Sequence, residues 1–424
     1  MTTHNAVQAA PLSLGLADLQ RVCRDLAFSE IGSMPAFKTA IASRLQAAPI
    51  SWASGTPDAA PGSLPLDSLA RMQLATAAAT WCNAYDAGFE DLFLAKRNVA
   101  DWAAVMLRAR SSGAQHVTFS SSGSTGVRKH IRHREDVLAR EAQAWCQVFA
   151  GFSPAQPIRR VVVLAPTHHI YGFIWGVLLP LALGVPALDA DVHALPELQP
   201  GDLLVAVPDQ WAWLAQGQRR WLGGVDGVQG VSSTAPLPAA VHRQLTDSSG
   251  GQPALLRLLQ IYGSSETAGL AWRADPDAPY TLAPGRSRNA SGGMALALPG
   301  GQQVDLAVQD ELSWASQTDF HLVRRLDHSV QVAGHNVSPD WVAAQLQSHP
   351  TVQAAAVRLS SSAQPPRLKA FVVMQAGQDH PPNRQAVQAW AAEHLPWYAN
   401  PGSFSYGAEL PRNALGKPSD WPDQ

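Results

Sequence analysis

Charged residues and cysteine are both scarce in this sequence. Only 15% of the 424 residues are charged while 46% are hydrophobic, which excludes a disordered chain and indicates a large buried core. The formal net charge of −2 provides no excess of positive charge for binding nucleic acid. The three cysteines, Cys23, Cys82 and Cys146, are widely spaced, so they indicate neither a disulfide framework nor metal-ligand pairs. This cysteine usage favours a reducing, cytoplasmic compartment.

A signal peptide and an uninterrupted membrane span are also missing. The N-terminus has no basic flank followed by a compact apolar block. Residues 170–188 carry no charge, but two prolines and three glycines interrupt this stretch. We therefore expect a buried helix followed by a strand here, and no membrane span.

Helical periodicity dominates the first part of the chain, within residues 12–45 and 66–110, on either side of an expected loop at 49–65. From residue 116 the pattern changes to apolar runs that alternate with helical stretches. The expected strands are 116–119, 160–165, 203–207, 228–232 and 256–261, and the expected helices are 135–149, 210–216 and 238–246. This alternation predicts a doubly wound α/β sheet, in which ligands bind at the carboxyl ends of the strands.

The last hundred residues have a different pattern. Expected strands at 330–332, 354–359 and 368–374 surround expected helices at 339–347 and 384–394. This is the content of a small α+β domain. We therefore divide the chain into a large domain, residues 1–325, and a small C-terminal domain, residues 326–424.

The most distinctive stretch runs from Phe119 to Lys129 with the sequence FSSSGSTGVRK, directly after an expected strand. Glycine allows backbone N–H groups to turn inward, and Ser and Thr add donors that can surround an anion. The spacing matches neither a Walker A loop nor a dinucleotide fingerprint. A polyphosphate site is the functional interpretation, and a flexible Ser/Gly linker is the alternative.

Two further polar segments follow strand ends. The first, Pro166–Gly172, contains His168 and His169, which are candidate metal ligands or polar loop residues. The second, Ile261–Thr267, contains Glu266 among hydroxyls, a set that suits Mg²⁺ next to phosphates. A polar turn capped by the glutamate is the alternative for this second segment.

Four segments in order resemble motifs of the adenylate-forming family, which comprises acyl-CoA synthetases, aryl-acid ligases and peptide-synthetase adenylation domains. The segments are Ser121–Lys129, Tyr262–Glu266, Arg325–Asp327 with Gly334–Val337, and Pro411–Lys417. Any one motif is weak, but four in order are specific. The resemblance implies a large N-terminal α/β domain, trimmed relative to typical members, and a small mobile domain that carries a catalytic lysine.

The resemblance also implies roles for individual residues. The expected phosphate loop consists of Ser121, Ser122, Gly123, Ser124, Thr125, Gly126 and Lys129. Tyr262, Gly263, Ser264 and Ser265 would contact the nucleotide, together with Thr234 and Ala235 near the adenine. Glu266 would hold Mg²⁺, and Lys417 would bridge the substrate carboxylate and the α-phosphate. His169, Tyr171 and Gly263 would border the acyl pocket, with His169 also counted among the catalytic residues, and Asp327 would be the hinge.

Some positions depart from the family pattern. Arg325 would bind the ribose, but the acidic partner is ambiguous, because Asp319 lacks the usual preceding glycine and lies close to Arg325 in the sequence. Asp310 is its rival. Val127 and Arg128 stand where a proline usually precedes the lysine, and Asn336 stands where arginine is common.

The sequence therefore predicts an AMP-forming acid–thiol ligase. Its substrates would be ATP, a carboxylic acid, and the thiol of coenzyme A or of the phosphopantetheine of an acyl carrier protein. The aromatic residues beside His169 and Tyr171 favour an aryl acid such as a hydroxybenzoate or coumarate. A fatty acid, a non-catalytic nucleotide-binding role and phosphoryl transfer are the competing hypotheses.

Overall fold

The computed structural model describes most of the chain. The described residues are 13–34, 51–53, 63–121, 129–152, 156–247, 255–298, 301–327, 329–333, 335–360, 366–411 and 419–422. The chain divides into two compact units. The first unit contains residues 1–119, 130–233 and 237–306, and the second contains 307–424 with the short segments 120–129 and 234–236.

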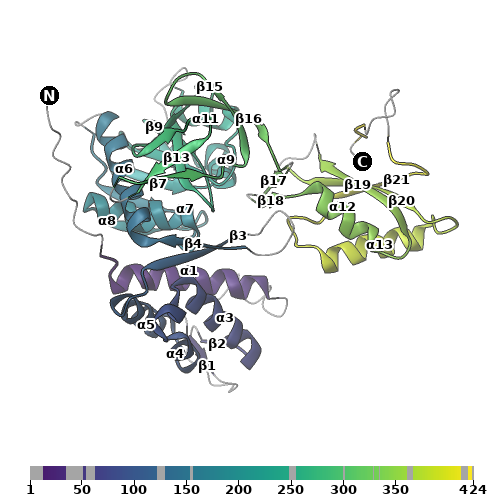
Figure 1. Ribbon diagram of the computed structural model, residues 1–424, viewed down its shortest axis with the longest axis horizontal. Helices are drawn as coiled ribbons and strands as arrows, with labels where there is room; N and C mark the ends of the chain where they lie inside the picture. The colour runs from purple at the N-terminus through teal and green to yellow at the C-terminus, as the bar shows by residue number, and fades with distance from the viewer. Residues whose placement is uncertain are drawn as a thin grey trace. The chain divides into compact units, whose positions relative to one another are not determined.

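Helices form the N-terminal part of the first unit, as the periodicity predicts. They are α1 (Leu16–Ser33), α3 (Ser68–Trp81), η2 (Ala84–Ala87), α4 (Glu90–Ala95) and α5 (Val99–Ser111). Helix α1 packs against α3 and α5 (Figure 1). Asp67 and Asn98 cap α3 and α5 by accepting hydrogen bonds from backbone N–H groups of the first turn.

One expectation for this region is wrong in part. The expected loop at 49–65 contains two three-residue strands, β1 (Ser51–Ala53) and β2 (Ser63–Pro65), which pair in parallel. Strands this short have too few residues to show an alternating pattern in the sequence.

The central sheet of the first unit confirms the predicted α/β fold. Its strands lie in the order β11-β10-β9-β8-β7-β5-β6. The parallel strands are β5 (Arg160–Val163), β6 (Ala187–Asp189), β7 (Asp202–Ala206), β8 (Gln229–Ser232) and β9 (Arg257–Ser264). Strands β10 (Ala268–Arg273) and β11 (Tyr280–Leu282) add an antiparallel edge, so the sheet is mixed.

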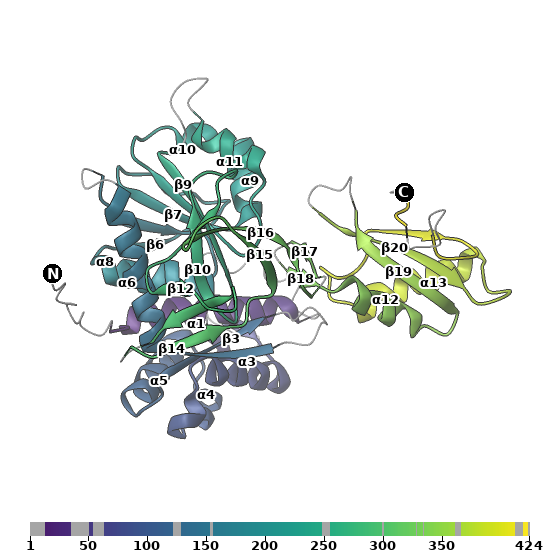
Figure 2. The same ribbon diagram turned by 45° about the horizontal axis from the view of Figure 1, so that its top comes forward.

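Both faces of this sheet are covered by helices (Figure 2). Side chains along β5 alternate between the two faces of the sheet. Val161 and Val163 belong to the hydrophobic core on one face, and Val162 and Leu164 belong to the core on the other. Burial on both faces explains why the strand reads as a continuous apolar run. The covering helices are α6 (Glu135–Phe152), α7 (Ile170–Phe173), η3 (Ile174–Leu178) and α8 (Leu179–Leu183) on one face, and α9 (Pro208–Gly217), α10 (Arg219–Leu222) and α11 (Ala239–Thr246) on the other.

Two smaller sheets complete the first unit. Strands β3 (His116–Ser121) and β4 (Lys129–Arg134) form a two-stranded sheet on either side of residues 122–128. Strands β12 (Arg286–Arg288), β13 (Met294–Ala297) and β14 (Gln303–Leu306) form a three-stranded antiparallel sheet.

The second unit is α+β, as expected for the C-terminal region. It begins with the hairpin β15 (Asp310–Trp314) and β16 (Asp319–Arg325), followed by the short pair β17 (Val330–Val332) and β18 (His335–Val337). Its main sheet contains β19 (Val352–Leu359), β20 (Leu368–Met374) and β21 (Ser403–Tyr406), with helices α12 (Pro339–Gln347) and α13 (Pro381–His394). Residues from 330 to 406 form their own hydrophobic core.

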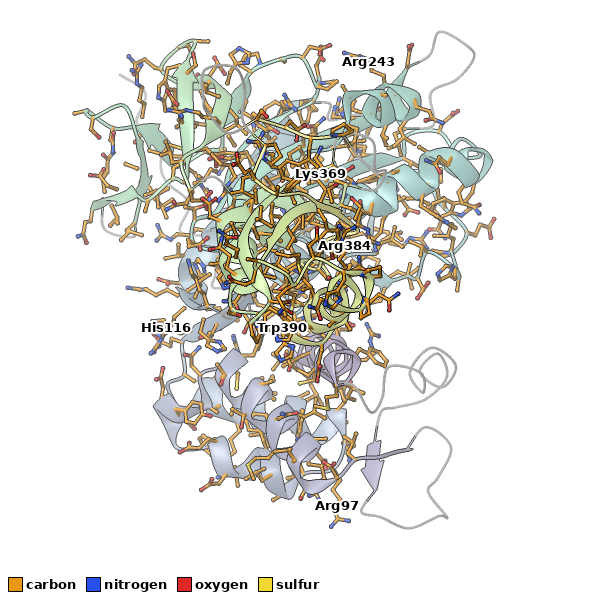
Figure 3. The ribbon with its side chains drawn as sticks, turned by 90° about the vertical axis from the view of Figure 1, so that its right-hand side faces the viewer. Arg97, His116, Arg243, Lys369, Arg384 and Trp390 are labelled. Carbon is orange, nitrogen blue, oxygen red and sulfur yellow. The ribbon has the colours of Figure 1, made fainter. Side chains whose placement is uncertain are left out.

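A short C-terminal segment is attached to the sheet of this second unit. The ammonium of Lys369 on β20, labelled in Figure 3, lies 3.0 Å from a carboxylate oxygen of Asp420 and donates to the carbonyl of Trp421. The Trp421 ring packs edge-on against Phe371. The N–H of Ser419 donates to the carbonyl of Pro411 at 3.0 Å.

Within the described part of the chain, no helix is both long and apolar enough to cross a membrane. Residues 170–188, the uncharged stretch, form α7, η3, α8 and β6 instead.

Candidate active site

The hairpin between β9 and β10 holds the segment Tyr262–Thr267 in a tight turn. Ser264 Oγ lies 3.2 Å from the backbone N of both Glu266 and Thr267 and accepts from them. The N–H of Ser264 donates in return to Thr267 Oγ1 at 3.1 Å. These bonds fix the turn from inside and leave the Glu266 carboxylate exposed at its tip. A carboxylate presented in this way can face a ligand or a metal ion.

Gly263 cannot carry a side chain in this hairpin. A Cβ at this position would lie 2.1 Å from the carbonyl oxygen of Ala268 on the paired strand. Close strand pairing therefore requires glycine at this position, in addition to the nucleotide and acyl contacts that the motif predicts.

The adjacent strand end has an unusual backbone. Thr234 has φ of 79°, a left-handed conformation that is rare for a β-branched residue. The Ser233 hydroxyl donates to the carbonyl of Ile261 at 3.0 Å, so the end of β8 is joined to β9. Strain of this kind is concentrated at functional sites, and the nucleotide-binding role of Thr234 and Ala235 stays a prediction.

The segment after β5 is fixed by the N-terminal helix α1. One Asp25 carboxylate oxygen accepts hydrogen bonds from the backbone N–H (2.8 Å) and the hydroxyl (2.6 Å) of Thr167. His168 is buried and His169 is exposed, with their ring centroids 4.1 Å apart. A cavity of about 410 Å³ lies between this segment and α1, lined in part by His168 and His169. The predicted acyl-site histidine therefore borders open space.

Tyr171 is buried, and its hydroxyl already has partners in the protein. The oxygen lies 2.8 Å from the carbonyl of Val231 and 3.1 Å from that of Ala206, at the ends of β8 and β7. Burial raises the pKa of this phenol well above its usual value. The geometry favours a packing role for Tyr171 over a hydrogen bond to a substrate hydroxyl.

This arrangement gives a prediction for Tyr171→Phe. Loss of the hydroxyl removes one donor to two carbonyls that also accept from the indole N–H of Trp211, so the free energy of unfolding should fall by only about 1 kcal/mol. The kcat/KM values for a hydroxylated and an unsubstituted aryl acid should change by the same factor. Urea unfolding and steady-state kinetics with the two acids measure these quantities. A decrease in kcat/KM confined to the hydroxylated acid would instead indicate that Tyr171 recognises the substrate hydroxyl.

The hairpin β15–β16 places the predicted ribose residues. Arg325 donates from Nε (2.8 Å) and Nη2 (2.7 Å) to the two carboxylate oxygens of Asp327. This contact, with a hydrogen bond from the N–H of Ser329, lowers the pKa of Asp327 to about 2. The predicted hinge residue is therefore also the side chain that orients the predicted ribose ligand.

The same hairpin separates the two candidate acidic partners of Arg325. Asp319 begins β16 and Arg325 ends it, so the two lie about 20 Å apart at about 3.3 Å per residue. Asp310 faces Arg325 directly across the ladder. The geometry disfavours Asp319 as the partner of Arg325 at a single ribose and favours its rival, Asp310.

Several predicted site residues lie outside the described part of the chain. They are Ser122, Gly123, Ser124, Thr125, Gly126 and Lys417. Ser121 ends β3, and the predicted phosphate ligand Lys129 begins β4, where it is exposed.

Known proteins resemble this chain over most of its length. The AMP-binding enzyme family matches residues 98–306, and the AMP-binding enzyme C-terminal domain matches residues 342–417. A 4-coumarate–CoA ligase from Halorhodospira halophila is 37% identical over 83% of this chain and 87% of its own length. The chain belongs to the AMP-binding enzyme family.

Other members of the AMP-binding family extend the comparison. A 4-coumarate–CoA ligase from Cereibacter sphaeroides is 35% identical over 84% of each chain. A 3,4-dihydroxybenzoate–[aryl-carrier protein] ligase from Bacillus anthracis is 24% identical over 70% of this chain and 71% of its own. Among solved structures, the amide bond synthetase McbA from Marinactinospora thermotolerans aligns with a TM-score of 0.56 at 18% identity, covering 95% of this chain and 92% of that one. The predicted family and fold class are confirmed.

Two features of this AMP-binding enzyme were not found from its sequence. Glu141 on α6 is buried, accepts from the N–H of Gly269 on β10 at 2.9 Å, and pairs with Arg286 at 2.7 Å. Burial raises the pKa of Glu141, and the Arg286 guanidinium opposes that rise. His133 on β4 contacts the carbonyl of Ser265. Both features join segments far apart in the sequence to the β9–β10 hairpin.

Metal ligands do not gather in the described part of this AMP-binding enzyme. No group of three or more His, Cys, Asp and Glu residues there could hold a metal ion. The alternative that His168 and His169 bind a metal therefore gains no support. Glu266 remains a candidate, because a single carboxylate suffices for an ion that takes its other ligands from phosphates and water.

Proposed function

We propose that this chain is an aryl-acid–CoA ligase whose acid is of the hydroxycinnamate type. The observation that carries the proposal is 35–37% identity to 4-coumarate–CoA ligases over most of both chains. These relatives confirm the sequence-based expectation of an AMP-forming acid–thiol ligase that activates an aryl acid with ATP. The particular acid is part of the proposal.

The reaction has two steps. In the first, a carboxylate oxygen of the acid attacks the α-phosphorus of ATP, which forms an acyl-adenylate and releases pyrophosphate. In the second, the thiol of coenzyme A attacks the acyl carbon, which forms the thioester and releases AMP. Catalysis of the first step depends on positioning and on neutralising the charge that develops around phosphorus.

The residues divide between these tasks. In our proposal Ser121–Lys129 surrounds the leaving phosphates, Ser265 contacts the α-phosphate, and Tyr262 faces the adenine beside Thr234 and Ala235. Lys417 neutralises charge between the carboxylate and the α-phosphate. His169 borders the acyl pocket, which the cavity of about 410 Å³ beside it supports.

Ribose binding falls to Arg325 with Asp310. Their positions directly across the β15–β16 ladder support this pairing, because side chains of ladder partners lie near one another. Asp327 keeps the guanidinium of Arg325 in a fixed orientation through two hydrogen bonds. A carboxylate and an oriented guanidinium together provide an acceptor and donors for the two ribose hydroxyls.

Coenzyme A is the thiol substrate that we favour. The relatives at 35–37% identity are CoA ligases, whereas the ligase that uses an aryl-carrier protein is only 24% identical. Transfer to an acyl carrier protein is the alternative. Comparing thioester yields with CoA and with a phosphopantetheinylated carrier protein tests the choice.

We place the domain boundary at residues 325 and 326 and the hinge at Asp327. The separate core formed by residues 330–406 supports a small domain that begins after this point. In our proposal, rotation of the small domain about Asp327 presents one of its faces to the nucleotide during adenylation and a different face during thioester formation.

Mg²⁺ fits the turn at the end of β9. Glu266 is an exposed residue of the turn, and the hydroxyls of Ser264 and Thr267 bond to the backbone of the same turn. Mg²⁺ is bound by one or two carboxylates with phosphates and water. When bound, the ion supplies positive charge that polarises the phosphates of ATP.

Glu266→Gln should therefore weaken the use of Mg²⁺-ATP. The amide keeps the shape of the side chain but loses the negative charge that attracts the ion, so we expect at least about a tenfold higher Mg²⁺ requirement. ATP–pyrophosphate exchange measured across a magnesium titration provides the test. Wild-type activity at low magnesium would exclude Glu266 as a ligand.

The proposed function is tested by ATP–pyrophosphate exchange with a panel of acids. The panel contains 4-coumarate, hydroxybenzoates, unsubstituted cinnamate and medium-chain fatty acids. We expect the highest kcat/KM with a hydroxylated aryl acid, and a CoA thioester as the product. A preference for fatty acids would show that the substrate is a fatty acid and not an aryl acid. Nucleotide binding without pyrophosphate exchange for any acid would favour the non-catalytic alternative.

A further inference from the structure

His133 makes a hydrogen bond to the turn that carries Glu266. Its Nε2 lies 2.7 Å from the backbone carbonyl oxygen of Ser265, 132 residues away in the sequence. A carbonyl oxygen can only accept, so Nε2 carries the proton and donates it. The contact therefore fixes which ring nitrogen of His133 is protonated.

The surroundings of His133 hold the ring in this orientation. The ring of Phe119 on β3 packs against it, with ring centroids 5.9 Å apart. Burial lowers the pKa of His133, and the hydrogen bond to Ser265 opposes that lowering. The packing and the hydrogen bond together direct Nε2–H at the carbonyl of Ser265.

The position of His133 gives this bond a particular consequence. Ser264 and Thr267 hold the turn through bonds within the hairpin itself. His133 holds the same turn from β4, the strand that begins at Lys129 and follows the predicted phosphate loop. The bond thus ties the strand next to one phosphate-binding segment to the backbone of the other.

We propose that His133 is a positioning residue for the binding of ATP. Its hydrogen bond holds the Ser265–Glu266 turn in a fixed position relative to β4, the strand that follows the predicted phosphate loop. This inference rests on the proposed function, because it assumes that both segments face the triphosphate. His133 does not itself touch the substrate. It acts through the backbone of Ser265, so its effect should appear in the use of Mg²⁺-ATP and not in the binding of the acid.

The test compares two substitutions that differ in their ability to donate. In His133→Gln, the amide Nε2 is the same number of bonds from Cβ as the imidazole Nε2, so the donor is retained. In His133→Met, a side chain of similar size has no donor, and the half-buried carbonyl of Ser265 loses the hydrogen bond from position 133. His116→Gln is the matched control, because His116, labelled in Figure 3, lies on the paired strand β3 and contacts Arg132 instead.

We expect His133→Met to raise the KM for Mg²⁺-ATP and lower kcat, with kcat/KM for ATP reduced at least about fivefold. The KM for the acid should stay within twofold of wild type. His133→Gln should recover most of the lost activity, and His116→Gln should behave as wild type. Backbone amide hydrogen exchange of residues 264–268 should be faster in His133→Met only.

Several results would overturn the proposal. They are wild-type kinetics for His133→Met, equal impairment of His133→Gln and His133→Met, or equal increases in the KM values of ATP and acid, which would indicate a general loss of structure. The wild-type acid panel separates this outcome from failure of the proposed function. If the wild-type protein is inactive with every acid, the proposed function fails. Hydrogen exchange tests the role of His133 independently of activity, because an unchanged exchange rate in His133→Met would show that His133 does not hold the turn.

Discussion

Lys417→Ala is expected to lower ATP–pyrophosphate exchange at least a hundredfold. The physical reason is the loss of a compact positive charge from between the carboxylate and the α-phosphate as the new P–O bond forms. Removing one electrostatic contact of this kind typically costs about 10²–10³ in rate. Lys417 itself lies outside the described residues. The described positions on either side of it, Pro411 and Ser419, are joined by a hydrogen bond of 3.0 Å.

The second half-reaction provides the internal control for this variant. With chemically supplied acyl-adenylate, thioester formation should persist, because Lys417 acts on the phosphate chemistry that this substrate bypasses. Lys96→Ala, at an exposed position after α4, should leave both steps unchanged. Undiminished pyrophosphate exchange in Lys417→Ala would remove this lysine from the catalytic residues.

Asp327→Pro is expected to have the opposite effect, with thioester formation lost and adenylation reduced only as far as the missing carboxylate weakens ATP binding. Proline fixes φ near −65°, which restricts rotation of the small domain about this position. ATP–pyrophosphate exchange reports the first step, and CoA thioester formation from supplied acyl-adenylate reports the second. We expect the ratio of the two rates to change by at least about tenfold relative to wild type.

A control is needed because Asp327 also holds Arg325. Asp327→Ala removes the carboxylate and its hydrogen bonds to Arg325 and Ser329 but leaves the backbone free to rotate. We expect this variant to weaken ATP binding without separating the two steps. If Ala and Pro reduce both steps alike, the effect comes from the lost carboxylate and the hinge lies elsewhere.

The parallel part of the fold could be predicted from the sequence because its physical signature is local. Strands β5 and β7 are buried at the centre of the sheet, and each is an apolar run that begins with a charged residue. The helices between them have an apolar face, and α6 begins at the predicted residue, Glu135. Elements of the small domain could also be predicted from local patterns, and β17, β20 and α12 have their predicted bounds.

The antiparallel part of the fold gave no comparable signal. Strand β15 alternates between exposed and half-buried residues and is only five residues long, so little distinguishes it from a loop. The choice between Asp310 and Asp319 depended on which residue lies opposite Arg325, and this register becomes visible only once the hairpin is formed.

The candidate site shows the same division between local and non-local information. The motif around Glu266 could be found because its residues are consecutive. The bond from His133 to Ser265 joins residues 132 positions apart, and no local pattern marks either one as a partner. The direction of the Tyr171 hydroxyl, toward Ala206 and Val231, is likewise set by tertiary packing.

The buried pair of Glu141 and Arg286 has a consequence for how this chain can change during evolution. Both side chains are almost completely buried, so losing either one leaves an uncompensated charge in the core at a cost of about 3–5 kcal/mol. That is a large share of the stability of a typical protein, so single replacements are removed by selection. The exposed pair of Arg324 and Glu311 is worth little and can drift one residue at a time. Glu141 and Arg286, 145 positions apart, should therefore covary among homologues, inherited together or replaced together.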